Sequence, residues 1–250
     1  MKIIALMNQK GGVGKTTCAI NIGAGLSSLG KKVCLIDLDP QAHLTCSLGI
    51  ASHTLEHTVY EMLTGKASLA QTLFTRGNLK IIPAKIELAG AEIELSGVAG
   101  REFLLREALE KLAGFDYVFI DCQPSLGLLT LNALTTAKEI YIPLQTEFLA
   151  LQGLSKLIQT VEIVQKRLNK EISITGIIAT RFDQRKNLSK EVIAKIKEYF
   201  DHTKIFKTVI RDNVALAEAP SFGQTIFEYK PDSNGAQDYL KLCKEILKRS

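Results

Sequence analysis

Residues 8–17 read Asn8-Gln9-Lys10-Gly11-Gly12-Val13-Gly14-Lys15-Thr16-Thr17 and follow directly on the apolar run Ile3 to Met7. A glycine-rich turn between a strand and a helix aims backbone N–H groups and a helix N-terminus at one point, where they can hold a phosphate group. The run therefore predicts a nucleotide site. The residues of this loop expected to bind the nucleotide are Gly11, Gly12, Val13, Gly14, Lys15, Thr16 and Thr17.

Two side chains of the loop have roles set by their chemistry. Lys15 is placed to lie between the β- and γ-phosphates, and the Thr16 hydroxyl is placed to ligate Mg²⁺. The usual phosphate loop has a further glycine five residues before Gly14, but this chain has Gln9 there. A second lysine, Lys10, stands four residues before Gly14 instead.

Composition favours a cytosolic α/β protein. The chain has 250 residues, of which 46% are hydrophobic and 6% aromatic, which suits a parallel sheet of aliphatic strands under helices. It contains neither a signal peptide nor the roughly 18 uninterrupted apolar residues of a membrane span. Its five cysteines are scattered and form no Cys-x-x-Cys pair, which disfavours disulfides, zinc and iron–sulfur clusters. A cluster that bridges two chains through isolated cysteines is an alternative that the spacing alone does not exclude. The net charge of +5 permits contact with nucleic acid.

Strand-like and helix-like patterns alternate along the chain. Strands are expected at 3–7, 33–37, 79–83, 117–121, 140–144, 172–180 and 205–210. Helices are expected at 15–29, 101–112, 126–137, 151–168, 188–200 and 236–248. The alternation predicts a mostly parallel, doubly wound sheet flanked by helices, forming one domain over residues 1–250.

The stretch from Ile50 to Gly77 is less regular and is interpreted as a loop with short helices. His53 and His57 in it have a spacing that fits a metal site on a helix. No third ligand is evident, so surface histidines are the preferred reading.

Three acids follow or end apolar strands. Asp37 and Asp39 end the run from Val33, and Asp121 ends the run from Tyr117. In parallel sheets ligands bind beyond the carboxyl ends of the strands, so these acids are expected beside the phosphate loop. One acid can support Mg²⁺ while another orients water, since phosphoryl transfer depends mainly on positioning and charge neutralisation. An ordinary Asp-Pro turn remains an alternative for Asp39.

The segment from Arg181 to Arg211 is basic. It holds nine Lys/Arg and four acids, an excess equal to the net charge of the whole chain. Such a patch binds phosphates without regard to sequence and with strong salt dependence. A solvated helix face is the alternative explanation.

Taken together, these motifs resemble those of the ParA/Soj chromosome- and plasmid-partitioning ATPases. The phosphate loop with its extra Lys10 is similar to the deviant Walker A motif of the ParA/MinD superfamily of P-loop NTPases. The likeness covers essentially the whole chain. Further matching stretches are Leu88 to Leu95, Cys122 to Gly127, Leu149 to Leu154, Asn213-Val214 and Glu218 to Ser221. Single matching positions then follow at Tyr229, Pro231, Ser233, Gly235 and Ala236.

The resemblance implies the chemistry and its cofactors, ATP and Mg²⁺. ATP-bound chains would form a sandwich homodimer in which Lys10 contacts the partner's phosphates and Lys15 its own. Asp39 matches the residue required for hydrolysis, so Lys10, Lys15 and Asp39 are the expected catalytic residues. Thr16 would ligate Mg²⁺ directly, and Asp37 and Asp121 would support it.

The resemblance also implies a DNA surface and a partner. The dimer would bind double-stranded DNA without sequence preference, as a cytoplasmic, nucleoid-associated protein, until a ParB-like protein stimulates hydrolysis. Arg185 occupies the position of a family DNA-contact arginine. The other DNA-binding candidates are Lys186, Lys190 and Lys207, and the adenine-side candidates are Arg211 and Asn213.

Three positions depart from the family pattern. Gln123 and Arg211 replace prolines, and Ala215 stands where a second DNA-contact arginine is expected. The departures predict an altered adenine-side loop and DNA affinity that is lowered or moved to other lysines.

Two other functions fit parts of the sequence. A MinD-like ATPase would use a basic amphipathic helix on membranes, but residues 236–248 coincide with the family's last core helix, so stable membrane association is not expected. A nucleotide-binding scaffold for a polar protein complex is the second alternative. The chain starts at its first core strand, so no N-terminal helix-turn-helix domain is expected.

Overall fold

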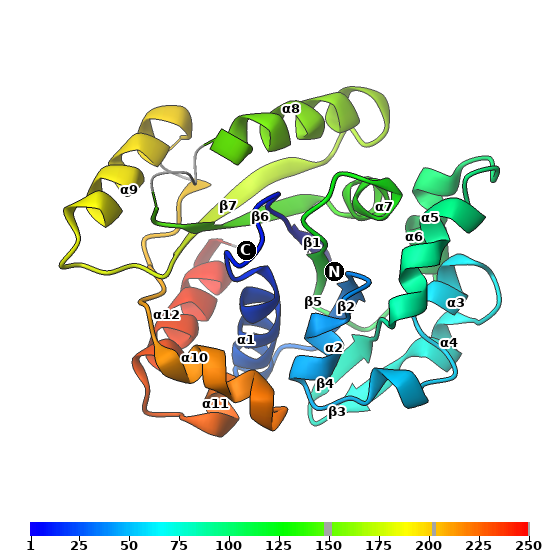
Figure 1. Cartoon of the computed structure of the whole chain (residues 1–250), viewed down its shortest axis with the longest axis horizontal. Coiled ribbons are helices and arrows are strands. Elements are labelled where there is room, and N and C mark those ends of the chain that lie inside the picture. The colour runs from blue at the N-terminus through cyan, green and yellow to red at the C-terminus, as the bar shows by residue number, and fades with distance from the viewer. Residues whose placement is uncertain (148–151, 202–203, 250) are drawn as a thin grey trace.

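A seven-stranded sheet forms the centre of the computed structural model, which describes residues 1–147, 152–201 and 204–249 (Figure 1). The strand order is β3-β4-β2-β5-β1-β6-β7. All neighbouring strands are parallel except β3 and β4. The strands are β1 (Lys2–Leu6), β2 (Val33–Leu38), β3 (Phe74–Arg76), β4 (Leu79–Ile82), β5 (Tyr117–Cys122), β6 (Glu139–Gln145) and β7 (Ser173–Thr180). The predicted fold class is confirmed, while the short antiparallel β3 was not predicted.

Helices cover both faces of the sheet (Figure 1). The α-helices are α1 (Lys15–Ser28), α2 (His43–Ser47), α3 (Val59–Leu63), α4 (Leu69–Thr72), α5 (Ala91–Glu94), α6 (Leu104–Ala108), α7 (Leu128–Thr136), α8 (Gln152–Arg167), α9 (Asn187–Tyr199), α10 (Val214–Glu218), α11 (Ile226–Tyr229) and α12 (Asn234–Arg249). Short 3-10 helices are η1 (Ser52–Thr54), η2 (Ile86–Gly90), η3 (Arg101–Phe103) and η6 (Ala219–Phe222). Short helices therefore do occupy much of the stretch from Ile50 to Gly77.

The central strands are apolar along their length because both of their faces are buried. In β5, Phe119 packs in the core under α1 and α12, while Val118 and Ile120 pack in the core under α7 and α8. All three side chains are fully buried. Successive residues of a strand point to opposite faces, so a strand covered on both sides has no polar alternation.

The C-terminal helix α12 docks on the body of the protein. Its apolar residues Tyr239, Leu242 and Ile246 are buried in the core cluster shared with α1, and the two helices lie side by side (Figure 1). Within the described residues, no helix is both long and apolar enough to cross a membrane. The apolar face of α12 is covered by protein.

The predicted strand at 205–210 is wrong. This segment runs along the edge of β7 and makes only isolated bridges, such as the one between Ile177 and Ile205. The carboxylate of Glu245 on α12 accepts the backbone N–H of Lys207 (2.8 Å) and of Thr208 (2.9 Å). Two donors are thereby diverted from a ladder, and no continuous strand forms.

The predicted helix at 101–112 is broken into η3 and α6, which ends at Ala108. Side chains of α7 bond the backbone at the break. Asn132 donates to the Arg101 carbonyl (2.9 Å) and accepts from the Leu105 N–H (2.9 Å). For the predicted helix at 151–168, the structure gives Gln152–Arg167. Residues 149–151 of the family-like stretch lie outside the described residues.

Candidate nucleotide-binding site

Three loops meet at one edge of the sheet. The phosphate loop follows β1, and β1 pairs with β5, which pairs with β2. In the parallel register, Asp37 of β2 lies opposite Asp121 of β5. The structure therefore brings the two predicted acids beside the loop, as the strand-end argument requires.

The phosphate loop has the backbone of an anion cradle. Gly12 has φ of 73° and Gly14 has φ of 91°, which are left-handed values that favour glycine. Gly14 is the N-cap of α1, so that helix begins at Lys15 with its N-terminus at the loop. Gly11 does not share the positive φ.

The two lysines of the loop lie in different surroundings. Lys15 is buried, and its Nζ donates to the carbonyl of Lys10 (3.3 Å). Burial lowers the pKa of the Lys15 ammonium, and the nearby acids Asp121 and Asp39 partly oppose this shift. The Nζ of Lys10 instead pairs with Oε2 of Glu147 (3.1 Å), and both side chains are solvent-accessible. Lys15 is thus an inward cation and Lys10 an outward one.

Thr16 and Asp121 form a pair that fits a divalent cation. The Thr16 hydroxyl donates to Oδ2 of Asp121 (2.6 Å). The other oxygen, Oδ1, is buried and has no hydrogen-bond partner among the described residues. A buried carboxylate oxygen without a donor, next to a hydroxyl at the phosphate loop, suits Mg²⁺, which prefers oxygen ligands.

Asp37 anchors the segment after β2. Its carboxylate is fully buried and accepts hydrogen bonds from Thr45 N (2.9 Å), Thr45 Oγ1 (2.7 Å) and Asp39 N (3.3 Å). Burial raises the pKa of Asp37 to about 6, although the bonds from Thr45 lower it. Burial and the neighbouring charge of Asp37 raise the pKa of Asp121 to about 8. Both raised pKa values show that the ionised forms are disfavoured, and Asp121 therefore favours its neutral form near pH 7 until a cation is near.

Asp39 lies half-buried just beyond the end of β2. Its Oδ1 accepts from the backbone N–H of Gln41 (2.9 Å), which fixes the turn after the strand. The side chain stays at the edge of the sheet that carries the loop.

A cavity of about 440 Å³ opens beside the loop. Gly12, Gly14 and Thr17 lie in one part of its wall, and Arg211 and Asn213 in another. The volume falls within the range of small-molecule sites. Both adenine-side candidates are therefore placed on the same cavity as the phosphate loop.

Arg211 is held in place by an acid that sequence reasoning missed. Oδ2 of Asp238, on α12, accepts from Arg211 N (3.0 Å) and Nε (2.9 Å), and Oδ1 accepts from Nη2 (2.7 Å). The Asp238 side chain is buried. Asn213 has a structural role as well, since its Oδ1 accepts from Ala215 N (2.9 Å) and caps α10.

The predicted DNA-contact residues are exposed but are not all in one element. Arg185 precedes α9, Lys186 is its N-cap and Lys190 lies in its first turn. Lys207 lies beyond α9, on the segment whose backbone bonds to Glu245 of α12. The structure groups the first three and leaves Lys207 on a separate segment.

The side chain of Arg185 is 85% exposed, and its guanidinium forms a side-on pair with Asp183. Its Nε donates to Oδ1 (3.0 Å) and its Nη2 to Oδ2 (2.9 Å). Hydrogen bonds from Arg185 hold the pKa of Asp183 at about 2. At the second position of the family pattern, Ala215 is buried, so it offers no contact surface.

A two-residue segment after β6 links the loop to α9. Glu147 holds Lys10, and the hydroxyl of its neighbour Thr146 lies 3.1 Å from the hydroxyl of Ser189 on α9. Both hydroxyls are buried. No sequence motif marks Thr146, Glu147 or Ser189 as partners, because the contacts join residues far apart in the chain.

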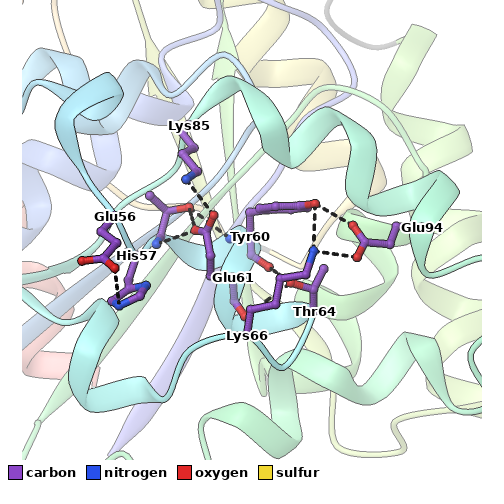
Figure 2. Close-up of polar contacts among 9 residues, drawn as sticks. Glu56, His57, Tyr60, Glu61, Thr64, Lys66, Lys85 and Glu94 are labelled. Carbon is purple, nitrogen blue, oxygen red and sulfur yellow. Dashed lines mark hydrogen bonds and ion pairs between the residues drawn. The ribbon is translucent and has the colours of Figure 1, made fainter.

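His53 and His57 do not assemble a metal site in the described residues. His57 pairs loosely with Glu56 (3.8 Å), as Figure 2 shows, and His53 is exposed. Throughout the described ranges, no group of three or more His, Cys, Asp or Glu residues could hold a metal ion. The five cysteines are free.

Comparison with known proteins identifies relatives over the full chain. A family model described as an AAA domain matches residues 1–174. The sporulation initiation inhibitor protein Soj of Bacillus subtilis (strain 168) is 50% identical over 98% of both chains. The chromosome-partitioning ATPase Soj of Treponema pallidum (strain Nichols) is 47% identical over 99% of this chain and 98% of its own.

A similar solved structure carries a nucleotide. The crystal structure of cobyrinic acid a,c-diamide synthase from Mycobacterium smegmatis with bound ADP and magnesium has a TM-score of 0.88 and 37% identity. It covers 100% of this chain and 95% of its own. The shared fold thus extends over the whole of this chain.

Proposed function

Because this chain belongs to the ParA/Soj family of chromosome-partitioning ATPases, we propose that it works as an ATP-dependent dimer that binds DNA without sequence preference. A ParB-like protein then stimulates hydrolysis and releases the DNA. The chain is an ATPase, and its cofactors are ATP and Mg²⁺.

The arrangement of the loop supports the roles that we propose for its residues. Lys15 would neutralise charge on the transferred phosphoryl group, and Asp39 would orient the attacking water. Thr16 and Asp121, with Asp37 behind them, would hold Mg²⁺, which would supply a Lewis acid to the bound nucleotide. Arg211 and Asn213 would form the adenine side of the cavity.

The main support for a dimer is that the Lys10 side chain points away from the nucleotide site of its own chain. Its Nζ pairs with Glu147, outside the set of described residues that line the cavity. The buried Lys15 already supplies a cation to the chain's own site. Lys10 is therefore available to complete the nucleotide site of a second subunit.

The basic surface at α9 supports DNA as the ligand. Arg185, Lys186 and Lys190 are exposed, and each phosphate contact they make would release a counterion. Binding would therefore be salt-sensitive and independent of sequence, and it would place the protein on nucleoid DNA.

The deciding experiment measures ATP turnover with DNA and with the candidate ParB-like protein, each alone and both together. We expect a slow basal rate and a rate with both that exceeds the sum of the separate effects. Turnover that depends on anionic liposomes would instead support a MinD-like membrane ATPase. The buried face of α12 argues against that outcome. Nucleotide binding without any stimulated turnover would support a scaffold.

A further inference from the structure

An apolar stripe is exposed on the helical stretch that follows β4. In η2 and α5, the inward face carries Leu88 and Ala91, which are fully buried. The outward face carries Ile86, Ala89 and Ile93, spaced by three and four residues as on one side of a helix. Ile86 is 64% exposed and Ile93 is 80% exposed. We call Ile86, Ala89 and Ile93 the β4 stripe.

The acid nearest the end of the β4 stripe is neutralised within the chain. Glu94 accepts from Lys66 Nζ (2.8 Å) and from the Tyr60 hydroxyl (2.6 Å), as Figure 2 shows. A second ion pair, between Lys85 and Glu61 (2.6 Å), ties the start of the stretch to α3. Both pairs attach the helical stretch to α3 and the segment after it.

A second acid ties the stripe to the nucleotide edge of the sheet. Oε1 of Glu92 accepts from Gln123 Nε2 and from Leu129 N, both at 3.4 Å. Gln123 follows Asp121 at the carboxyl end of β5, and η2 follows the carboxyl end of β4. The β4 stripe and Lys10 therefore lie at the same edge of the sheet.

The charge of the stretch restricts the occupant. Residues 86–100 contain three acids and no lysine or arginine, which disfavours DNA and anionic lipid as ligands. A two-fold interface joins a patch to its own copy, so in a self-contact this stretch meets its own acids. Glu94 is paired with Lys66, and Glu92 accepts hydrogen bonds from Gln123 and Leu129, which limits the repulsion between the two copies.

We propose that the β4 stripe packs across the two-fold axis against the β4 stripe of a second copy, within the dimer proposed above, on which this inference rests. The stripe then closes the interface on the β4 side of the nucleotide, while Lys10 crosses on the other side. Each dimer removes two copies of Ile86 and Ile93 from water, and burial of such side chains drives association.

The test compares wild type, Ile93→Glu and the control Ile163→Glu by light scattering after size exclusion, with Mg²⁺ and either ADP or ATPγS. Ile163 is 57% exposed on α8, on the part of the helix that returns to the start of β7, away from the nucleotide edge. We expect ATPγS to dimerise wild type and Ile163→Glu. We expect Ile93→Glu to dimerise at least ~100-fold more weakly, because the dimer buries the substitution twice.

Folding and nucleotide binding are checked with fluorescent ADP, whose affinity for Ile93→Glu should match that for wild type. A mixture of Ile93→Glu with Ile93→Lys should recover dimers that neither variant forms alone, because the stripes face each other. Failure of the mixture to recover would overturn the face-to-face arrangement.

The outcomes separate this inference from the proposed function. If wild type stays monomeric with ATPγS, the dimer and the stripe interface are both refuted. If wild type and Ile93→Glu dimerise equally, only the stripe interface is refuted. If Ile93→Glu dimerises normally but loses stimulation by the ParB-like protein, the stripe belongs to that partner and the inference is overturned.

Discussion

Replacing Asp121 by asparagine should flatten the pH dependence of stability of the nucleotide-free protein. The pKa of Asp121 is raised to about 8 in the folded chain, whereas an unfolded aspartate titrates near 3.9. Between these values the folded state binds a proton that the unfolded state lacks. The free energy of unfolding therefore falls as pH rises through this window, and the stability is fully present only below about pH 4.

The size of the change in the free energy of unfolding follows from the pH range between the two pKa values of Asp121. Each pH unit changes the free energy of unfolding by about 1.36 kcal/mol for one such group, so Asp121 accounts for up to about 2.5 kcal/mol between pH 5 and pH 7. In a protein of this length that corresponds to roughly 5–10 °C in Tm. Asp37, with its pKa raised to about 6, contributes a smaller decrease in the free energy of unfolding as pH rises towards 6.

The assay is thermal unfolding at pH 5, 6, 7 and 8 without Mg²⁺ or nucleotide. We expect Asp121→Asn to lose less stability across this range than wild type. The exposed Asp232 provides the control Asp232→Asn, which should keep the wild-type slope. Saturating Mg²⁺ and ATPγS should abolish the wild-type loss, since a cation favours the ionised acids. If Asp121→Asn loses stability as steeply as wild type, the proton that causes the pH dependence is bound by a group other than Asp121.

Three further substitutions test other contacts. Arg185→Glu should weaken DNA binding about tenfold or more at moderate salt and reduce the salt slope, while ATP affinity stays unchanged; equal affinities in a salt titration would refute the contact. Asp238→Ala should lower the free energy of unfolding by about 2–3 kcal/mol in urea and weaken ATP binding, because it strands the Arg211 guanidinium and N–H; unaltered affinity for fluorescent ATP would remove Arg211 from the site. Glu147→Gln should strengthen ATPγS-dependent dimerisation severalfold by freeing Lys10 from an exposed ion pair, and an unchanged dimer dissociation constant would show that the pair imposes no cost.

The phosphate loop and the acids could be predicted because the residues that define each of them lie within one short, continuous stretch of sequence. A strand, a glycine-rich turn and a helix start determine where Lys15 and Thr16 lie, and a strand end determines where Asp121 lies. Parallel pairing then brings the ends together. The predicted sheet is confirmed for the same reason.

Contacts between distant segments could not be predicted. Asp238 lies 27 residues after Arg211 and Glu147 lies 137 residues after Lys10, and neither pair follows a spacing rule. The wrong prediction of a strand at 205–210 has the same cause, because Glu245 on the distant helix α12 accepts two backbone N–H groups of this segment. Sequence patterns indicate the local preference for a helix or a strand. These contacts depend instead on side chains from distant segments, which only the folded structure brings close.

The Thr146–Ser189 contact couples the position of the phosphate loop to the position of α9. Thr146 anchors α9 and the adjacent Glu147 holds Lys10, so one peptide unit serves both the phosphate loop and the basic helix. A substitution that displaces this unit disturbs both attachments at once. Substitutions on the outer face of α9 therefore leave this contact in place, whereas a shift of the helix itself requires compensating changes around Lys10.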